Sequence, residues 1–407
     1  MIELAQARTL VRNSLAECTP AVERVPLEAA LGRYLADDLR APGNVPGFVH
    51  AAMDGYAVRA SDLHAAGVTR LQVAATVLAG GAAAPAIDAG ECVRIMTGAP
   101  LPAGADTVVI REHTSVDAAD VLIQPGSAAG ANVRAADDDF SAGTLALRAG
   151  SRLDAAALGV LASFGFAAVA VRAQLRVAVL VTGDELVAPG LPLGFGQRYD
   201  SNRSLLTGLL REHGALITDA RQVADDPQAI EGALRDCALR ADLLLTTGGA
   251  SAGDADFLPS LLARIGRQVF WKVAMRPGMP VLFGHLDGVP LFGLPGNPVS
   301  VFATFVALVR PAIAQLMGAP MIDPPPVHAR LTQMLHKRHT RLEFRRARLL
   351  AADDGVLHAE INPSTSSGAL RSVIEADALV ELAAPARDYA VGDLVSAHRI
   401  RSGQWLS

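Results

Sequence analysis

The chain has 407 residues, of which 51% are hydrophobic and 4% aromatic, and its formal net charge at pH 7 is −5. This length predicts about two to four domains with aliphatic cores, and the acidic balance argues against a general binder of nucleic acid or anionic membranes. The longest apolar stretch, Val299–Val309, is too short to span a bilayer. Cys18, Cys92 and Cys237 lie far apart, so we expect no zinc knuckle, no disulfide framework and a cytoplasmic location.

The first part of the chain predicts a β domain inserted into a helical one. Residues 1–41 carry apolar side chains at helical spacing, including Leu27, Leu31 and Leu35. In residues 42–136, Gly and Pro separate short apolar runs at intervals of about 8–12 residues, which is typical of all-β structure. Helical spacing returns in residues 137–173, so we expect one split helical domain, 1–41 plus 137–173.

The second part predicts a doubly wound α/β domain followed by a small β domain. LRVAVLVT is a nearly continuous apolar run, as expected for a parallel strand covered on both faces. Strand and helix patterns alternate over residues 174–320, with Ser201 or Asn202 as the expected N-cap of the first helix. After a Pro-rich linker, residues 327–407 contain short strands typical of a small β-barrel or a sandwich. The fold class is therefore multidomain α/β plus β.

The stretch LLLTTGGASAGDAD, Leu243–Asp256, carries the strongest chemical signal. A buried strand ends in glycines and hydroxyls, which let backbone N–H groups approach an anion closely. The acidic residues that follow suit a phosphate site only if Mg²⁺ lies between them and the phosphate. A Gly-rich turn with an acidic helix start is equally compatible with this segment alone. The residues concerned are Gly248, Gly249, Ser251, Gly253, Asp254 and Asp256.

Three predicted strands of the α/β domain end in polar turns. These turns are TGDE at Thr182–Glu185, the Gly-rich loop, and LPGNP at Leu294–Pro298. Ligands of open α/β sheets bind beyond the carboxyl ends of the strands. If these strands are neighbours, Glu185 and Asp256 can share one metal ion, and Asp225 can add a third carboxylate. Glu185 or Asp225 alone would more often be a helix cap or a first-turn acid.

Two cationic segments are candidates for anion binding. FWKVAMRPGMP places Lys272 and Arg276 where a strand runs into a turn, and both cations could point to one side of it. They would form an oxyanion clamp or a solvated edge. In the last domain, Arg341 and Arg345 share one face of a predicted strand, which is usually a solvated face.

The remaining polar turns are weak signals when each is taken alone. Asp54 and Thr97 lie in separate turns of the inserted β domain, and Ser366 and Ser367 lie in a hydroxyl-rich loop. The ten histidines show no HExxH spacing, and the chain has no GxSxG elbow. The Gly-rich loop lacks the lysine of a Walker loop. A histidine metal site, a serine hydrolase and a P-loop NTPase are therefore disfavoured.

Taken together, the motifs resemble one family, the molybdopterin molybdenumtransferases (MoeA, and the gephyrin E domain). The motifs occur in the family's order and cover nearly the whole chain: MDGYA, RIMTGAPLPAGADTVV, VTGDEL, YDSNRSLL, TTGGASAGDADF, KVAMRPGMP, GLPGNPVS and SSGALRS. The resemblance implies an L-shaped four-domain subunit that forms a homodimer, with an α/β domain similar to that of molybdopterin adenylyltransferases and a C-terminal β-barrel. It implies a reaction in which molybdate is inserted into adenylylated molybdopterin with release of AMP.

The resemblance also implies a role for each matching residue. Mg²⁺ would be held by Glu185, Asp225 and Asp256. The substrate would be held by Gly248, Gly249, Ser251, Gly253, Asp254, Pro295, Asn297, Pro298 and Ser300. Molybdate would be held by Lys272, Arg276, Arg341, Ser366 and Ser367. Asp54 and Thr97 would act in catalysis, reaching the cleft from the partner subunit. One departure is Met279, which stands where the family commonly has lysine.

The implied partners are a second copy of the chain, a molybdopterin adenylyltransferase in transient contact, and molybdoenzymes or their chaperones as acceptors. Neither nucleic acid nor membrane is expected. Two alternative functions stay open from the sequence. One is a molybdopterin adenylyltransferase that uses MgATP, and the other is a non-catalytic molybdopterin-binding scaffold.

Overall fold

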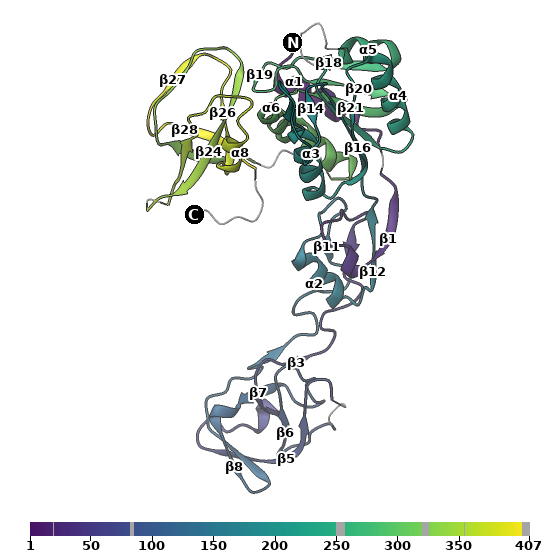
Figure 1. Cartoon of the computed structure of the whole chain (residues 1–407). Helices are drawn as coiled ribbons and strands as arrows, with labels where there is room; N and C mark the ends of the chain where they lie inside the picture. The colour runs from purple at the N-terminus through teal and green to yellow at the C-terminus, as the bar shows by residue number, and fades with distance from the viewer. Residues whose placement is uncertain (19, 82–84, 250–256, 320–324, 354, 401–407) are drawn as a thin grey trace.

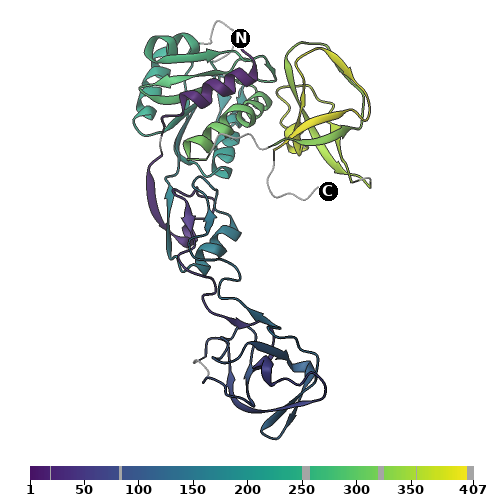
Figure 2. The ribbon, with the colours of Figure 1, turned by 180° about the vertical axis from the view of Figure 1, so that it is seen from behind.

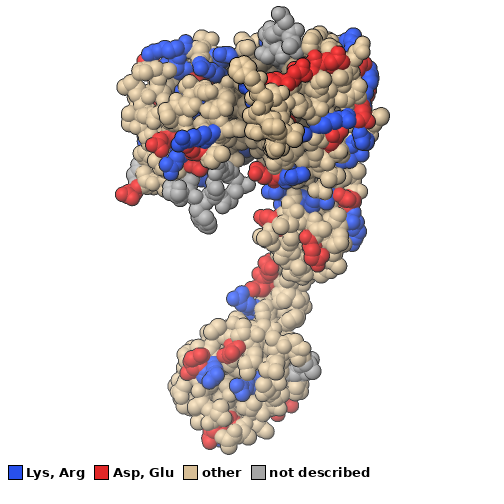
Figure 3. All heavy atoms as spheres, in the orientation of Figure 1, with Lys and Arg blue, Asp and Glu red and all other residues tan. Residues whose placement is uncertain are grey.

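The computed structural model is an elongated molecule of four regions (Figure 1). It describes residues 1–18, 20–81, 85–249, 257–319, 325–353 and 355–400. An α/β domain and a β-barrel lie side by side at one end, and a distal β domain lies at the other, as both views show (Figures 1 and 2). A narrow stalk connects the two ends. On the visible face, acidic and basic side chains are interspersed rather than segregated (Figure 3).

The distal β domain is built on one six-stranded sheet of order β7-β4-β6-β5-β9-β8. Its strands are β4 (Gly55–Val58), β5 (Thr69–Val77), β6 (Glu91–Ile95), β7 (Thr107–Ile110), β8 (Thr114–Asp117) and β9 (Asp120–Ile123). A separate pair, β3 (His50–Ala51) and β10 (Val133–Arg134), connects it to the stalk. The all-β pattern predicted for this segment matches these strands.

The stalk contains less helix than its sequence pattern predicted. It consists of paired strands β1 (Val22–Pro26) with β12 (Ala168–Arg172) and β2 (Leu39–Arg40) with β11 (Leu145–Leu147), plus one helix, α2 (Ala155–Ser163). The helix expected around Leu27–Leu35 is not formed: only Leu27–Ala29 makes a 3-10 turn. Leu35 is instead buried against Leu153 and Val171, so tertiary packing overrides the helical spacing.

The α/β domain has a six-stranded sheet of order β16-β13-β17-β21-β20-β18. Strands β13, β16, β17 and β21 are parallel, and β20 and β18 extend the sheet in antiparallel fashion. These strands are β13 (Arg176–Thr182), β16 (Leu216–Val223), β17 (Leu243–Thr247), β18 (Arg267–Trp271), β20 (Leu282–Leu286) and β21 (Val289–Leu294). A short parallel pair, β14 (Leu186–Val187) with β15 (Arg198–Tyr199), follows β13.

Helices cover both faces of this sheet, which confirms the doubly wound prediction. Along β13, Val177 and Val179 face one apolar cluster, and Ala178 and Leu180 face the other. Helices α1 (Leu4–Ser14), α3 (Ser201–Glu212), α6 (Pro298–Thr304) and α7 (Arg310–Leu316) cover the first face. Helices α4 (Pro227–Ala238) and α5 (Leu258–Ile265) cover the second. Helix α1 crosses the back of the domain, away from the stalk (Figure 2).

Helices α6 and α7 are continuous through a π-helical turn, Phe305–Val309. Pro311 has no N–H to donate to Ala307 O, and Arg8 Nε of α1 donates to that oxygen instead, at 3.1 Å. The combined helix, Pro298–Leu316, is the one described helix long and apolar enough to cross a membrane, but 83% of its apolar window is buried inside the protein. It therefore serves as a core helix of the domain.

The C-terminal region is a closed barrel in which β24-β25-β22-β28-β26 returns to β24. Its strands are β22 (Val327–Leu331), β24 (Leu342–Ala351), β25 (Leu357–Ile361), β26 (Ala378–Leu382) and β28 (Leu394–Arg399). A hairpin of β23 (Leu335–Lys337) with β27 (Arg387–Tyr389) and helix α8 (Arg371–Ile374) complete it. The α/β domain adds β19 (Met275–Arg276), which pairs with β24. Phe344, Val373 and Leu379 join the α/β core, so the two domains share one apolar seam.

Candidate functional site

The three polar strand ends predicted from the sequence meet in one cavity of about 570 Å³. Strand β17 lies between β13 and β21 and is parallel to both, so all three carboxyl ends open at the same edge of the sheet. The cavity is lined by Glu185 after β13, by Gly248 and Gly249 after β17, and by Pro295–Pro298 after β21. Asp225, which follows β16, lines it as well.

Gly248 is required because it touches the neighbouring strand end. A Cβ atom at this position would lie 2.5 Å from Thr182 O and 2.6 Å from Thr182 Oγ1. Gly248 and Gly249 also have positive φ angles, +92° and +62°. These two glycines let the chain turn sharply while its backbone stays close to the cavity. A ligand can therefore reach the backbone without meeting a side chain here.

A buried hydrogen-bond network fixes the loops after β17 and β21 to each other. Asn202 Nδ2 donates to Thr247 Oγ1 at 3.0 Å and to Gly296 O at 2.7 Å. Thr247 Oγ1 donates to Pro295 O at 2.9 Å. The sequence favoured Ser201 or Asn202 as the N-cap of α3, but Asp200 takes that role by accepting from Arg203 N at 3.0 Å. Asn202 is thereby free to bridge the two loops.

The acidic side of the cavity brings Glu185 and Asp225 together. The loops after β13 and β16 are joined by reciprocal contacts of 3.3 Å between Asp184 and Asp225, each backbone N–H donating to the other side chain. Gln222 Nε2 donates to Gly183 O and Leu186 O, both at 3.0 Å, and so braces the turn that carries Glu185. Two predicted carboxylates of one metal site therefore share a wall.

Several buried oxygen atoms around this cavity make no hydrogen bond. They are Thr182 Oγ1, Asn202 Oδ1 and Asp200 Oδ2, of which Asp200 Oδ2 forms an ion pair with Arg203 Nε at 3.3 Å. All three residues line the cavity. Buried polar atoms without partners are rare in proteins and indicate a missing ion, water or ligand. Hydroxyl, amide and carboxylate oxygens are the ligands that Mg²⁺ prefers.

Two helix N-termini and one barrel loop complete the cavity. Ser201 opens α3 and Ser300 lies in the first turn of α6, and both residues line the wall. Helix N-termini carry partial positive charge and favour anionic ligands. From the barrel, Gly368 and Leu370 reach the same wall. The hydroxyl-rich loop of residues 364–368, called the serine loop below, is fixed to α6 because Val299 N donates to Ser367 O at 3.0 Å.

The predicted cations lie outside the described lining of this cavity. The sequence predicted one strand that carries Lys272 and Arg276 and runs into a turn. This prediction is wrong, because β18 ends at Trp271 and Lys272 has a φ angle of +69°. Lys272 Nζ lies 4.0 Å from the centre of the Trp271 ring. Arg276 is on β19, where it pairs in register with Glu343 of the barrel. Arg341 donates from Nη1 to Met279 Sδ at 3.4 Å.

Asp54 and Thr97 form a pair in the distal β domain, at the far end of the molecule from the cavity (Figure 1). Asp54 Oδ1 accepts from both the backbone N and the Oγ1 of Thr97, each at 2.7 Å. These hydrogen bonds, the backbone one first, lower the pKa of Asp54 below its usual value. The two turns, which were weak signals separately, thus make one exposed carboxylate site.

Four predicted site residues, Ser251, Gly253, Asp254 and Asp256, lie outside the described residues. Asp200 and Asn202 also line the cavity, although neither was predicted as a site residue from the sequence. Their signal was the motif YDSN, whose polar residues follow a short strand and open a helix, as in the other strand ends.

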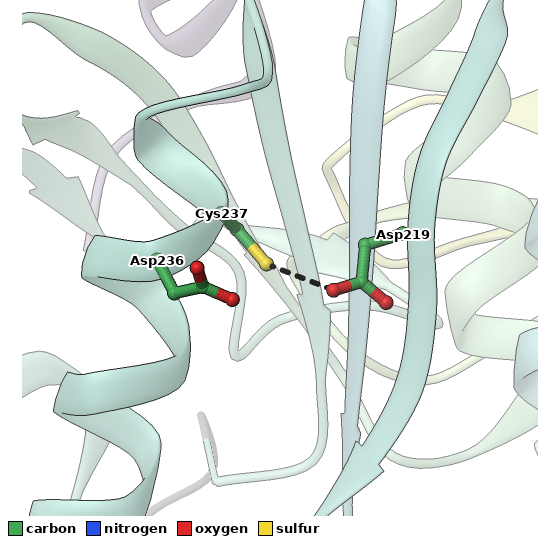
Figure 4. Close-up of side chains that lie close together, drawn as sticks. All are labelled: Asp219, Asp236 and Cys237. Carbon is green, nitrogen blue, oxygen red and sulfur yellow. Dashed lines mark hydrogen bonds between the residues drawn. The ribbon is translucent and has the colours of Figure 1, made fainter.

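A separate cluster contains Asp219 of β16 with Asp236 and Cys237 of α4 (Figure 4). Cys237 Sγ lies 3.7 Å from Asp219 Oδ2, and burial raises the pKa of this thiol. Arg221 already supplies the positive charge, with Nη2 donating to Asp236 Oδ2 at 2.7 Å and Nε lying 3.3 Å from Asp219 Oδ2. This cluster is an ion-pair network that needs no metal ion.

Comparison with known protein families divides the chain into three matched segments. Residues 2–165 match the MoeA N-terminal region (domain I and II), and residues 178–315 match a probable molybdopterin binding domain. Residues 328–400 match the MoeA C-terminal region (domain IV). These segments correspond to the distal domain with its stalk, the α/β domain and the barrel.

Similar proteins span nearly the whole chain. A molybdopterin molybdenumtransferase of Haemophilus influenzae is 35% identical over 398 residues, which is 97% of this chain and 98% of that protein. Molybdopterin molybdenumtransferase 2 of Mycobacterium tuberculosis is 36% identical over 85% of this chain and 87% of that protein. The structure of a molybdopterin biosynthesis MoeA protein from Pyrococcus horikoshii has a TM-score of 0.85 at 26% identity, covering 98% of this chain and 99% of that chain. The chain therefore belongs to the molybdopterin molybdenumtransferase (MoeA) family.

Proposed function

We propose that this transferase of molybdenum cofactor biosynthesis inserts molybdate into adenylylated molybdopterin in the cytoplasm, with Mg²⁺-dependent release of AMP. The observation that carries the proposal is the single cavity at the ends of β13, β17 and β21, lined by carboxylates on one wall and glycines on another. A pyrophosphate needs both features: close backbone approach and a cation held next to it.

The residues of the cavity have complementary tasks in this reaction. Gly248 and Gly249 leave the backbone uncovered, so that the pyrophosphate can lie against it. The N-termini of α3 and α6 direct their positive ends to the same phosphate oxygens. The Asn202 network keeps the two phosphate-facing loops at a fixed separation. Water or a molybdate oxygen would attack phosphorus, because no nucleophilic side chain of the protein is assigned to that step.

The described residues fit a magnesium ion. Glu185, Asp200 and Asp225 line the cavity, and the buried oxygens Thr182 Oγ1 and Asn202 Oδ1, from residues of the same lining, have no hydrogen-bond partner. We assign Glu185 and Asp225 to the ion, with Asp256 as the third predicted carboxylate. When bound, Mg²⁺ would neutralise the charge of the phosphoanhydride that is cleaved.

We propose that the working unit is a homodimer, because Asp54 and Thr97 are far from the cavity of their own chain. They belong to the distal β domain, which the stalk separates from the α/β domain that carries the cavity (Figures 1 and 2). In a twofold-symmetric dimer the distal β domain of each chain can complete the cavity of the partner subunit. A molybdopterin adenylyltransferase would supply the substrate, and molybdoenzymes or their chaperones would accept the product.

The first experiment supplies the chain with adenylylated molybdopterin and Mg²⁺ and measures AMP release with and without molybdate. We expect release that depends on molybdate, and a loss of about 100-fold or more in Glu185→Gln and Asp256→Asn. Glu360→Gln, an exposed carboxylate on the barrel, is the matched control. Wild-type turnover in both site variants would refute the assignment. ATP consumption without molybdate would indicate an adenylyltransferase, and tight pterin binding without turnover would indicate a scaffold.

The second experiment tests whether the partner subunit completes the site. Asp54→Ala and Glu185→Gln, each inactive alone, are mixed under conditions that exchange subunits. A mixed dimer then contains one intact site, so random mixing should restore about a quarter of wild-type activity. No recovery in a mixture shown to contain mixed dimers would refute the partner contribution.

A further inference from the structure

The end of the barrel next to β19 contains a cluster of titratable and charged side chains: Arg276, His339, Arg341, Glu343 and Arg345. Successive residues of a strand alternate between faces, and Ala347 and Leu349 of β24 point into the apolar barrel core. Glu343 and Arg345 lie on the same face of this strand, closer to its start. The cluster therefore continues the barrel interior toward the α/β domain, where Arg276 of β19 pairs in register with Glu343.

The charges of this cluster do not balance. The carboxylate of Glu343 contacts two members of the cluster. Its Oε2 lies 3.2 Å from His339 Nε2, and its Oε1 lies 3.9 Å from Arg345 Nη1. Burial, followed by the charge of Arg276, lowers the pKa of Arg345 against the pull of Glu343. Burial also lowers the pKa of His339, and the charges of Lys337, Arg276 and Arg341 add to this effect against the pull of Glu343. Among the described residues, the charged neighbours of His339 are therefore Lys337, Arg276 and Arg341 on the positive side and Glu343 on the negative side.

Several donors of the cluster lack good acceptors. Arg345 Nε is buried without a hydrogen-bond partner, and so is His339 Nδ1, whereas His339 Nε2 lies 3.2 Å from Glu343 Oε2. The acceptor that Arg341 Nη1 finds is a thioether, Met279 Sδ, which is weak. Unsatisfied donors beside excess positive charge indicate a site for an anion.

Two chain segments connect this cluster to the cavity. Pro280, next to Met279, lines the cavity wall. Arg345 Nη2 donates to Asn362 O at 3.4 Å, and Arg346 Nη2 donates to Ser364 O at 2.5 Å, at the start of the serine loop. Gly368 at the end of that loop lines the cavity. The cluster and the cavity are therefore connected through the segment after β19 and through the loop between Asn362 and Gly368.

We propose that Arg345 is a further ligand of the tetrahedral oxyanion, acting with Arg276 and Arg341, and that Glu343 is its placeholder counter-ion. This inference rests on the proposed function, in which the oxyanion is molybdate. In the free protein, Glu343 offsets part of the positive charge. A dianion that enters the cluster competes with Glu343 for the guanidinium groups, which suit its oxygens through paired N–H donors.

The two residues therefore have opposite predicted effects on affinity. Arg345→Met removes a ligand and should weaken molybdate binding by about tenfold or more. Glu343→Gln removes the competitor while keeping the shape, and should strengthen binding by about threefold or more. Arg345→Lys should recover part of the loss, because it restores the charge without the planar fork. Arg348→Met, an exposed arginine on the same strand, should change nothing.

The test is calorimetric titration of the full chain with sodium molybdate, without pterin, together with the Michaelis constant for molybdate in the AMP-release assay. Both readouts should move in the stated directions for the two variants. A purely structural role of Glu343 would weaken binding when it is removed, so unchanged or weaker binding in Glu343→Gln overturns the placeholder role. Wild-type affinity in Arg345→Met overturns its role as a ligand.

The outcomes also separate this inference from the proposed function. If wild type releases AMP in a molybdate-dependent reaction while Arg345→Met keeps its Michaelis constant, the inference fails and the function stands. If wild type shows no molybdate-dependent release, the function fails first. Melting temperatures without molybdate report on folding. We expect Glu343→Gln to melt lower than wild type in its absence and to gain more from added molybdate.

Discussion

Adding one methyl group to Gly248 tests how the cavity is built. The new Cβ would lie 2.5 Å from the backbone oxygen of Thr182, a separation that real Cβ atoms do not show. Thr182 ends β13, so the overlap can be relieved only by moving that strand end or the Gly-rich turn. Glu185 follows β13 directly, and its position in the cavity changes with such a shift.

Two other glycines provide matched comparisons. At Gly249 the nearest neighbour of an added Cβ would be Thr182 Oγ1 at 3.6 Å, so space is sufficient and only the φ of +62° is unfavourable. Gly249→Ala should cost about 1 kcal/mol of unfolding free energy. Gly248→Ala adds the overlap to a similar backbone cost, about 3–4 kcal/mol in total. Gly232 lies inside α4, and an added Cβ there would have no heavy atom of another residue within 4 Å. Gly232→Ala should therefore raise the free energy of unfolding by about 1 kcal/mol.

The measurements are the midpoint of denaturant unfolding and the rate of molybdate-dependent AMP release. We expect the order Gly232→Ala, wild type, Gly249→Ala, Gly248→Ala in falling stability, with a large loss of activity only in the last. Equal stability and equal activity of the Gly248 and Gly249 variants would refute the predicted overlap, because an added Cβ meets Thr182 O at 2.5 Å only at Gly248.

Three further predictions concern buried titratable groups. Lys337 Nζ donates to His339 O and Ala384 O at 2.6 Å and to Pro385 O at 3.1 Å, so Lys337→Met should lower stability by about 2–4 kcal/mol in a denaturant titration, and an unchanged midpoint would contradict this. Burial lowers the pKa of His213, so the unfolded state binds more protons than the folded state in mild acid. The contribution of this residue to the free energy of unfolding is therefore complete above about pH 6.5 and falls below it. His213→Gln should reduce the loss of unfolding free energy measured between about pH 7.5 and pH 5.5. Burial raises the pKa of Cys92 to about 12, so a thiol reagent at about pH 8 should label native Cys18 well before Cys92 or Cys237, as mass spectrometry can show.

The sequence predicted the residues that line the cavity because each strand and the turn after it carry a recognisable local pattern. Continuous apolar runs identified β13, β17 and β21, and each run ended in glycines or acids that strands do not favour. The carboxyl ends of parallel strands must lie at one edge, so Glu185, Gly248 and Asn297 could be expected together once the strands were neighbours. The structure supplied that condition through the order β13-β17-β21.

Other features depended on tertiary contacts that no local pattern contains. The helix expected near Leu31 was lost because burial of Leu35 in the stalk outweighed helical spacing. Lys272 and Arg276 do not share a strand, because Lys272 has a left-handed backbone conformation and Arg276 lies on β19, which pairs with the barrel strand β24. The bridging role of Asn202 needed two loops from distant strands. Pairing of Asp54 with Thr97 likewise joined turns that are 43 residues apart.

The two ends of the molecule differ in how firmly they are fixed to the cavity. Phe344, Val373 and Leu379 bury the barrel against the α/β core, so the cationic cluster and the cavity keep one geometry. Fixed geometry is what joining two bound reactants requires. Among the described residues, the distal β domain has no such seam, because its buried apolar residues form clusters of their own and the paired strands of the stalk lie between it and the α/β domain. Asp54 therefore cannot be held at its own cavity by packing within one chain. In a dimer, the distal β domain of a second copy could contact this cavity directly. That contact would give Asp54 the fixed position that catalysis needs, and subunit mixing tests that requirement.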